Sequence, residues 1–343
     1  MTAQQSQISY KSEKESSRLL CLDQLRGYAI FGMILVNYLG FFRWAPHWFE
    51  HNKDHFSYAD TIAPLFIFVV GMGFRLSVKS RAAKAGEMNA LWHAAKRYAV
   101  LFCVGVVFYG PDFHTDWWDA LIQIALSGML ALFLINRPAW MRVAFGIICL
   151  AAFSLLYFRT GYEAWMLTSM NGGPLSPLAY VFVLLAGTIG YDILESNDTS
   201  SVMKASGIWI AATLAGAIII ALALPKGVTH EEFGPLYFTA KRWSLPPFIL
   251  ISTACAFAAL AFFYWINEEK GIELPHLSAL GMNPLVIYLV QYSLLEMRHT
   301  YLPRRFSEEG ANILPGLIGY VVFYFVVYAA AWRLHKDKVI IKL

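Results

Sequence analysis

The sequence has few charged side chains. Asp, Glu, Lys and Arg make up 15% of its 343 residues, whereas 58% are hydrophobic. A soluble domain has roughly 25% charged and about 45–50% apolar residues. This scarcity of charge excludes a disordered chain, a coiled coil and a nucleic-acid-binding domain, and it argues against a water-soluble enzyme. The formal net charge of +4 does not by itself indicate a polyanionic partner.

Cysteine is also scarce, and several familiar motifs are absent. The four cysteines lie in or beside apolar segments, which favours buried thiols over a disulfide framework: Cys21, Cys103, Cys149 and Cys255. The sequence contains no glycine-rich nucleotide loop, no serine nucleophile elbow and no Cys–His pair with catalytic spacing. These absences exclude the common nucleotide-binding and serine- or cysteine-hydrolase patterns.

Long apolar segments recur along the chain after a polar, serine-rich stretch. A helical span requires about 20 mostly apolar residues. We expect ten spans, at residues 25–43, 59–78, 95–110, 119–136, 139–158, 176–194, 205–225, 246–266, 277–297 and 314–333. The sequence therefore predicts an all-α, polytopic membrane protein. Residues 1–18 would form a polar cytoplasmic tail, and residues 19–343 a single transmembrane domain.

The distribution of basic residues predicts the orientation. If the tail lies inside the cell, most of the 27 Lys and Arg residues fall in connections on that side. Because Lys and Arg are enriched in cytoplasmic loops, we expect both termini in the cytoplasm. The connection from Arg75 to Arg97 is strongly basic and would face anionic lipids and cofactors.

Several polar side chains lie within or beside the expected spans, where a charge costs about 2.5–3.5 kcal/mol. Asp23 and Arg26 are three positions apart and can form an ion pair on one helix, and Arg26 could also bind a phosphate. Asn37, Gln123 and Asn283 are amides within the spans. Each indicates either a packing hydrogen bond between helices or a group that lines a cavity.

A histidine-rich connection precedes the second span. If it is helical, His47, His51 and His55 line one face of the helix. Three interpretations follow. The histidines could belong to a solvated interfacial loop, they could share a zinc ion, or one of them could act as a general base. In the last case Asp60, which enters the next span, could orient the base.

Five segments carry a further pattern, in this order along the chain: LDQLRGYAIFGMILVN at 22–37, ADTIAPLFIFVVG at 59–71, LIQIAL at 121–126, KRWSLP at 241–246 and GMNPLVIY at 281–288. They resemble the heparan-alpha-glucosaminide N-acetyltransferase family, which belongs to a wider group of transmembrane acyltransferases. Two positions depart from the family pattern. Ile124 stands where the family has Arg, and Pro284 stands where it has Ser.

The resemblance implies an acetyltransferase that takes acetyl-CoA on the cytosolic side. The acceptor would be a sugar amine or hydroxyl on the far side of the membrane. A histidine before the Asp60 segment would be catalytic, and His51 fits that position with a one-residue gap. His55 and His47 remain alternatives. Asp60 would steady the imidazolium, and no metal is expected.

The resemblance also suggests a donor site and an assembly. The basic residues would hold the phosphates of acetyl-CoA, and the amides would line a tunnel for its pantetheine arm: Arg26, Lys96 and Arg97, then Asn37, Gln123 and Asn283. Because the large luminal N-terminal part of the eukaryotic enzyme is absent, we expect a bacterial inner-membrane protein. The family tendency favours a homodimer in contact with membrane lipids.

Two other classes of protein compete with this interpretation. A multi-span transporter or lipid-handling protein would also bury amides, although the sequence gives no sign of the paired short or broken helices that mark many carriers. A zinc-dependent membrane hydrolase could use the histidine face. The acceptor itself is not encoded in any motif.

Overall fold

The computed structural model describes residues 3–52, 54–110, 112–113, 117–162, 165, 172–196, 198–223, 236–301 and 312–341. Within these ranges every regular element is a helix, as the sequence predicts. The α-helices are α1 (Ala3–Leu39), α2 (Tyr58–Ala85), α3 (Glu87–Tyr109), α4 (Ala120–Ala131), α5 (Ala139–Arg159), α7 (Pro177–Glu195), α8 (Thr199–Ala223), α9 (Pro246–Tyr264), α10 (Pro275–Met282), α11 (Pro284–Tyr301) and α13 (Ile313–Lys336). Short helical turns are η1 (His47–Phe49), η2 (Tyr237–Thr239), η3 (Lys241–Trp243) and the π-helical turn η4 (Trp265–Glu269).

Helices α2, α7 and α9 form the interior of the bundle. The apolar stretch of α7 is 83% buried, and those of α2 and α9 are each 61% buried. Small residues bring α2 and α7 into close contact: a Cβ atom at Gly71 would lie 2.0 Å from the carbonyl oxygen of Leu184, and one at Gly187 would lie 1.9 Å from that of Phe68. Glycine at both positions lets the two backbones touch, as is common where helices associate in membranes.

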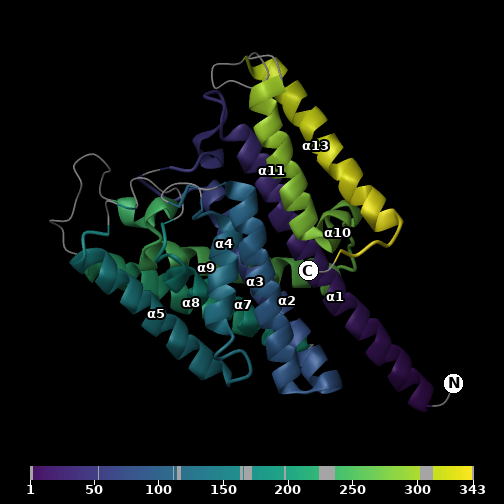
Figure 1. Cartoon of the computed structure of the whole chain (residues 1–343). Coiled ribbons are helices and arrows are strands. Elements are labelled where there is room, and N and C mark those ends of the chain that lie inside the picture. The colour runs from purple at the N-terminus through teal and green to yellow at the C-terminus, as the bar shows by residue number, and fades with distance from the viewer. Residues whose placement is uncertain are drawn as a thin grey trace.

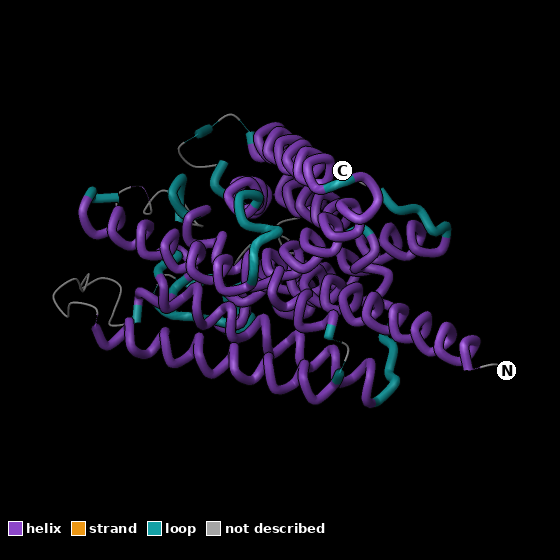
Figure 2. Tube along the Cα trace, turned by 90° about the horizontal axis from the view of Figure 1, so that it is seen from below, coloured by secondary structure: helices purple, strands orange, loops and turns teal. Residues whose placement is uncertain are grey.

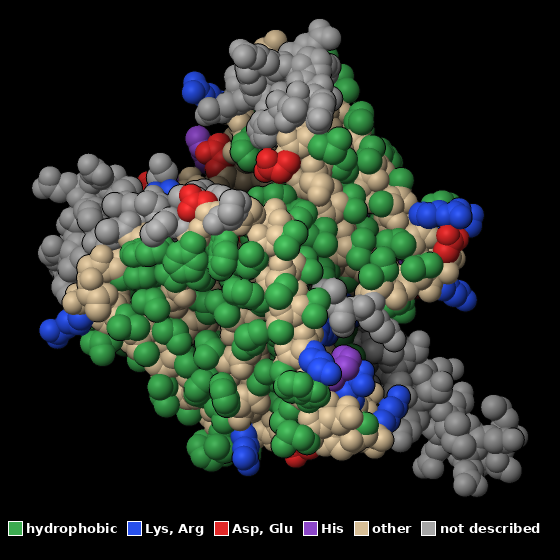
Figure 3. All heavy atoms as spheres, in the orientation of Figure 1, with side chains coloured by type: hydrophobic (Ala, Val, Ile, Leu, Met, Phe, Trp, Pro, Cys, Tyr) green, Lys and Arg blue, Asp and Glu red, His purple; other side chains and the backbone are tan. Residues whose placement is uncertain are grey.

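The outer helices expose apolar faces. Only 17% of the apolar stretch is buried in α8 and in α13, and 22% in α3. Figure 3 shows hydrophobic side chains spread over the visible face, with most charged side chains near its margins. Such a surface suits hydrocarbon on the outside, so the chain is a membrane protein.

The number of spans differs from the ten that we expected. Seven of the described helices are long and apolar enough to cross a membrane, namely α2, α3, α5, α7, α8, α9 and α13. The expected span at 119–136 contains α4, which has only 12 residues. The first expected span lies in α1, which continues without a break from Ala3 and projects from the bundle at its N-terminal end (Figures 1 and 2).

The expected span at 277–297 is not one straight helix. Helices α10 and α11 meet at an angle of 88° and form at most one further span, which makes eight. Pro284 opens α11 directly after Asn283. Because proline has no N–H and disfavours helical backbone in the residue before it, it ends α10 at this point. Hydropathy alone registers both pieces as one apolar segment.

Candidate active site

The N-terminus of α2 positions Asp60. Ser57 caps the helix, and Asp60 occupies the third helical position, where its Oδ2 accepts a hydrogen bond from the Ser57 backbone N–H at 3.1 Å. This is a capping-box arrangement with aspartate in place of the usual glutamate. The Asp60 side chain is completely buried. The sequence of the helix start therefore fixes one carboxylate oxygen and leaves the other available.

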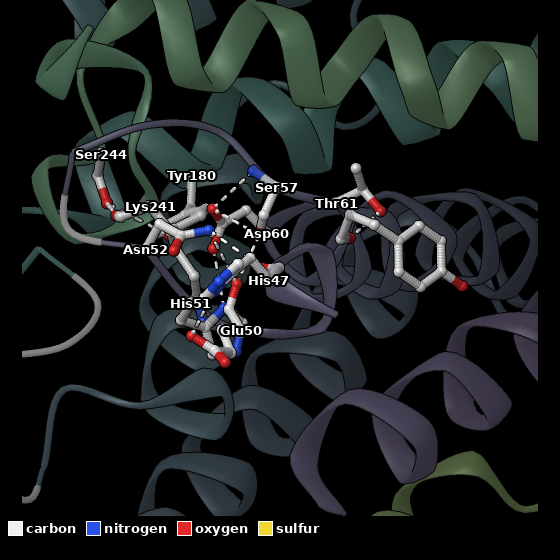
Figure 4. A network of polar contacts seen from close by, with 11 residues as sticks. His47, Glu50, His51, Asn52, Ser57, Asp60, Thr61, Tyr180, Lys241 and Ser244 are labelled. Carbon is white, nitrogen blue, oxygen red and sulfur yellow. Dashed lines mark hydrogen bonds and ion pairs between the residues drawn. The ribbon is translucent and has the colours of Figure 1, made fainter. Parts of the chain in front are cut away.

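His51 forms a hydrogen bond with the second carboxylate oxygen of Asp60. Its Nδ1 lies 2.8 Å from Asp60 Oδ1, and 29% of the imidazole side chain is exposed. An ionised carboxylate can only accept, so Nδ1 carries the proton and Nε2 of the neutral ring has a free lone pair. The pair is a base with a fixed tautomer, held by a helix cap (Figure 4).

His51 faces a cavity of about 400 Å³. The cavity lies at the end of the bundle where α1 ends and α2 and α4 begin. Its polar lining comes from α1, the loop before α2, the start of α4, η3 and α11: Asn37, Glu50, His51, Asp119, Lys241, Tyr288, Tyr292 and Glu296. Of the six residues predicted to hold acetyl-CoA, Asn37 is the one that lines this cavity.

Lys241 is the buried cation beside the pair. It is 9% exposed and belongs to η3, so the chain reaches the cavity from a segment far away in sequence (Figure 4). Ser244 ends η3 in a left-handed conformation with φ of 49°, and its hydroxyl donates to the Lys241 carbonyl oxygen at 3.1 Å. A non-glycine residue in this region stores strain, which is frequent at functional sites.

Burial and charge shift the pKa values of both bases. Burial lowers the pKa of His51 below its usual range, and the positive charge of Lys241 lowers it further, while Asp60 opposes both effects. Burial also lowers the pKa of Lys241, against the attraction of Asp119 and then Asp60. His51 is therefore neutral, and so able to accept a proton, at a lower pH than an ordinary histidine.

The other two histidines lie elsewhere. The described residues between η1 and α2, 50–52 and 54–57, are not helical, so the histidine face that we considered from the sequence does not form. His55 bonds Asp54 at 2.7 Å, and His47 lies 3.5 Å from Glu50 with 84% of its side chain exposed. Neither lines the cavity. The zinc hypothesis assumed that the three histidines lie on one helix, and that assumption is wrong.

Arg26 lies on α1 before the stretch that lines the cavity, which begins at Met33. Its Nη1 donates to Asp23 Oδ1 at 2.9 Å, which is the ion pair expected from their spacing. Arg97 is close enough to Arg26 to interact with it electrostatically, and it is exposed together with Lys96. The Lys96 ammonium lies 5.2 Å from the centre of the Trp92 ring. Figure 3 shows basic side chains and a histidine gathered near the N-terminal end of α3.

The two remaining amides bond within the protein. Gln123 donates from Nε2 to the hydroxyl oxygen of Ser176. Asn283 donates to the Val339 carbonyl oxygen and accepts from the Ile341 N–H, both at 2.8 Å. These contacts match the packing alternative, and neither amide lines the cavity.

Sequence reasoning left out several cavity residues. Asp119 directly precedes the apolar run of α4 and accepts from the Ala120 N–H, so its place as a helix N-cap was recognisable. Lys241 and Tyr288 lie in two of the five ordered segments but carried no assigned role. Glu296 offered no local signal, because α11 brings it to the cavity only through the bend after α10.

Comparison with known proteins shows which family the chain resembles. Residues 18–232 match the family model described as heparan-alpha-glucosaminide N-acetyltransferase, catalytic. A stretch of 119 residues, 34% of the chain, is 31% identical to heparan-alpha-glucosaminide N-acetyltransferase of Mus musculus. A stretch of 117 residues, 33% of the chain, is 31% identical to the Homo sapiens protein of the same name.

A third relative comes from Bacillus acidopullulyticus, where a 39.9 kDa protein of an amylase 3' region is 37% identical over 121 residues, 34% of this chain. The aligned segments span 17% of the mouse and human proteins and 33% of the bacterial one. The family match confirms the resemblance, and three of the five ordered segments, at 22–37, 59–71 and 121–126, lie within the matched residues.

Proposed function

The chain belongs to the heparan-alpha-glucosaminide N-acetyltransferase family, and we propose that it transfers an acetyl group from acetyl-CoA to an amino sugar or a sugar hydroxyl across the membrane. The observation that carries the proposal is the His51–Asp60 hydrogen bond at the wall of a cavity. It supplies a base of fixed tautomer where a donor and an acceptor can meet.

The basic end of the molecule supports acetyl-CoA as the donor. Arg26, Lys96 and Arg97 offer positive charge for phosphate groups, which arginine in particular can bind through two parallel hydrogen bonds. Asn37 follows Arg26 by eleven positions on α1, which corresponds to about 16 Å along the helix axis. A pantetheine arm is long enough to extend over that distance, so phosphates held at Arg26 would leave the thioester near Asn37 and His51.

The pair of His51 and Asp60 would activate the acceptor. His51 Nε2 takes a proton from the attacking amine or hydroxyl, and Asp60 stabilises the imidazolium that forms. The low pKa of His51 keeps it in the accepting form at neutral pH. His55 and His47 are weaker candidates because they lie outside the cavity lining.

We also propose an orientation. The basic end faces the cytoplasm together with both termini, and the cavity opens toward the outer side, as in a protein of a bacterial inner membrane. The positive-inside rule supports this arrangement, since the basic connection between α2 and α3 lies at the opposite end of α2 from His51 and Asp60.

Acetyl transfer by the purified protein tests the proposal. The protein is reconstituted in liposomes with radiolabelled acetyl-CoA on one side and a panel of amino sugars and neutral sugars on the other. We expect label on at least one sugar, and transfer should require donor and acceptor on opposite faces. Absence of acetylation by a folded protein that binds acetyl-CoA would contradict the proposal.

One observation favours a second candidate, a transporter or lipid-handling protein. The break between α10 and α11 resembles the discontinuous helices that line substrate sites in carriers. In this case the same liposomes would accumulate or exchange a solute without acetylating it. The product analysis therefore separates the two functions.

A further inference from the structure

Lys241 is the one cation among the described residues that line the cavity. Lys241 is only 9% exposed, so it has lost most of its contact with water. Such burial is costly unless nearby negative charge offsets it. Asp119 and Asp60 provide that charge, and both act on Lys241. Lys241 therefore lies in a buried position where two carboxylates favour its charged form against the cost of burial.

The backbone around Lys241 fixes its position. The strained turn at Ser244 ends η3, and the buried indole of Trp243 packs against Tyr237 with ring centres 5.8 Å apart. The Ser244 hydroxyl lies 3.3 Å from the hydroxyl of Tyr180 on α7, which ties η3 to the interior helix. A lysine placed only for solubility would not require such a support.

Acyl transfer creates a negative charge that His51 and Asp60 cannot stabilise. When the acceptor attacks the thioester carbonyl carbon, the C=O electron pair moves to oxygen and an oxyanion forms. The carboxylates that line the cavity are Glu50, Asp119 and Glu296, and they repel that oxygen, as does Asp60 behind His51. Lys241 carries three N–H donors and a positive charge.

We propose that Lys241 is the oxyanion-stabilising residue of the transfer, an inference that rests on the proposed function. The acceptor nitrogen or oxygen bonds to the carbonyl carbon, and its proton moves to His51 Nε2. Lys241 donates a hydrogen bond to the oxyanion. The oxyanion then collapses, the C–S bond breaks, and the departing thiolate takes the proton from His51. The products are the acetylated acceptor and the free thiol of CoA.

If Lys241 stabilises the oxyanion, loss of its charge should cause the fall in activity at high pH. The titratable groups around it are Asp60 from α2, Asp119 before α4, His51 and Glu50 from the loop, Tyr180 from α7, and Tyr288, Tyr292 and Glu296 from α11. Because burial lowers the pKa of Lys241, activity should decline at a pH below the usual range of lysine. Arginine stays charged throughout this range.

The test compares Lys241→Met and Lys241→Arg with the wild type. For each protein, kcat and KM are measured between about pH 6 and pH 10, a range in which lysine loses its charge before arginine does. Lys241→Met should lower kcat by roughly 10²–10³-fold, the range typical of a lost oxyanion donor. Its KM for acetyl-CoA should change little. Lys241→Arg should keep more of kcat than Lys241→Met and should lose the alkaline decline.

Arg242→Met is the matched control, because Arg242 is the next residue of η3 and does not line the cavity. If Lys241→Met fails to fold, Lys241→Arg still decides through its pH profile. Unchanged kcat in Lys241→Met, or an unchanged alkaline decline in Lys241→Arg, overturns the inference. His51→Ala is measured beside them. If it loses transfer while Lys241→Met keeps full activity, only the role of Lys241 fails; if the wild type transfers nothing, the proposed function fails.

Discussion

The Oδ1 atom of Asp60 lies 2.8 Å from Nδ1 of His51, and the same carboxylate caps α2 through its other oxygen. Helix formation and orientation of the imidazole therefore depend on a single side chain. Burial makes this contact strong, because no water competes for the carboxylate. Substitution of Asp60 should therefore affect both the start of α2 and the orientation of His51.

Asp60→Asn should lower kcat by about 10²–10⁴-fold, the range by which general base catalysis accelerates reactions. The amide can bond to His51 in the wrong tautomer, so Nε2 would carry the proton. The KM for acetyl-CoA should stay within about threefold, since donor binding depends on contacts distant from His51 that the substitution leaves unchanged. Steady-state kinetics on the purified variant give both numbers.

Asp54→Asn provides the control for that substitution, because Asp54 bonds His55 outside the cavity lining. It should retain full transfer. Equal losses in the two variants would show that Asp60 acts only through general effects of charge on this loop.

The pH dependence of kcat should show an acid limb below the range of an ordinary histidine. His51 must be neutral to accept a proton, and its lowered pKa means that protonation begins only at a lower pH. An unperturbed histidine would lose half of its activity near pH 6.5. The wild type should keep more than half of its activity at that pH in a rate–pH series, whereas a midpoint above it would contradict the burial and charge effects assigned to His51.

Arg26→Ala should weaken acetyl-CoA binding by about tenfold or more, the equivalent of one charge-assisted hydrogen bond. Arg97→Ala should have a smaller effect because Arg97 is exposed. Calorimetry with acetyl-CoA measures both. Arg333→Ala is the control, since Arg333 on α13 is exposed and pairs with Asp337, which directly follows that helix. Equal affinity in all three variants would place the donor elsewhere.

Asn283→Ala distinguishes a tunnel residue from a packing residue. Its two hydrogen bonds hold residues 339–341 against the start of α11. Loss of both bonds should lower thermal stability, by about 1–3 kcal/mol in the free energy of unfolding. Transfer kinetics at low temperature should be unchanged. A raised KM for acetyl-CoA at unchanged stability would instead support the tunnel assignment.

The sequence predicted the all-helical membrane fold and the position of most spans, because long apolar runs are a strong local signal. It failed at α4 and at the α10–α11 pair, where hydropathy does not register helix length or a bend at Pro284. The ion pair of Asp23 and Arg26 was predictable from spacing on one helix.

The candidate site was predictable only in part. His51 and Asp60 are nine residues apart, so the sequence could suggest their pairing. Lys241 lies in the ordered segment at 241–246, but its contribution depends on a tertiary contact between distant segments, so the segment alone gave it no role. The histidine face was wrong because it assumed a helix where the chain has only the three-residue turn η1.

The most direct measurement is acetyl transfer by His51→Ala and His55→Ala in the same liposome assay. Both substitutions remove an imidazole from one loop, and both imidazoles bond an aspartate, at 2.8 Å and 2.7 Å respectively. They differ in that only His51 lines the cavity. We expect His51→Ala to abolish transfer with acetyl-CoA binding retained, and His55→Ala to transfer at the wild-type rate. Full turnover in His51→Ala would contradict the account.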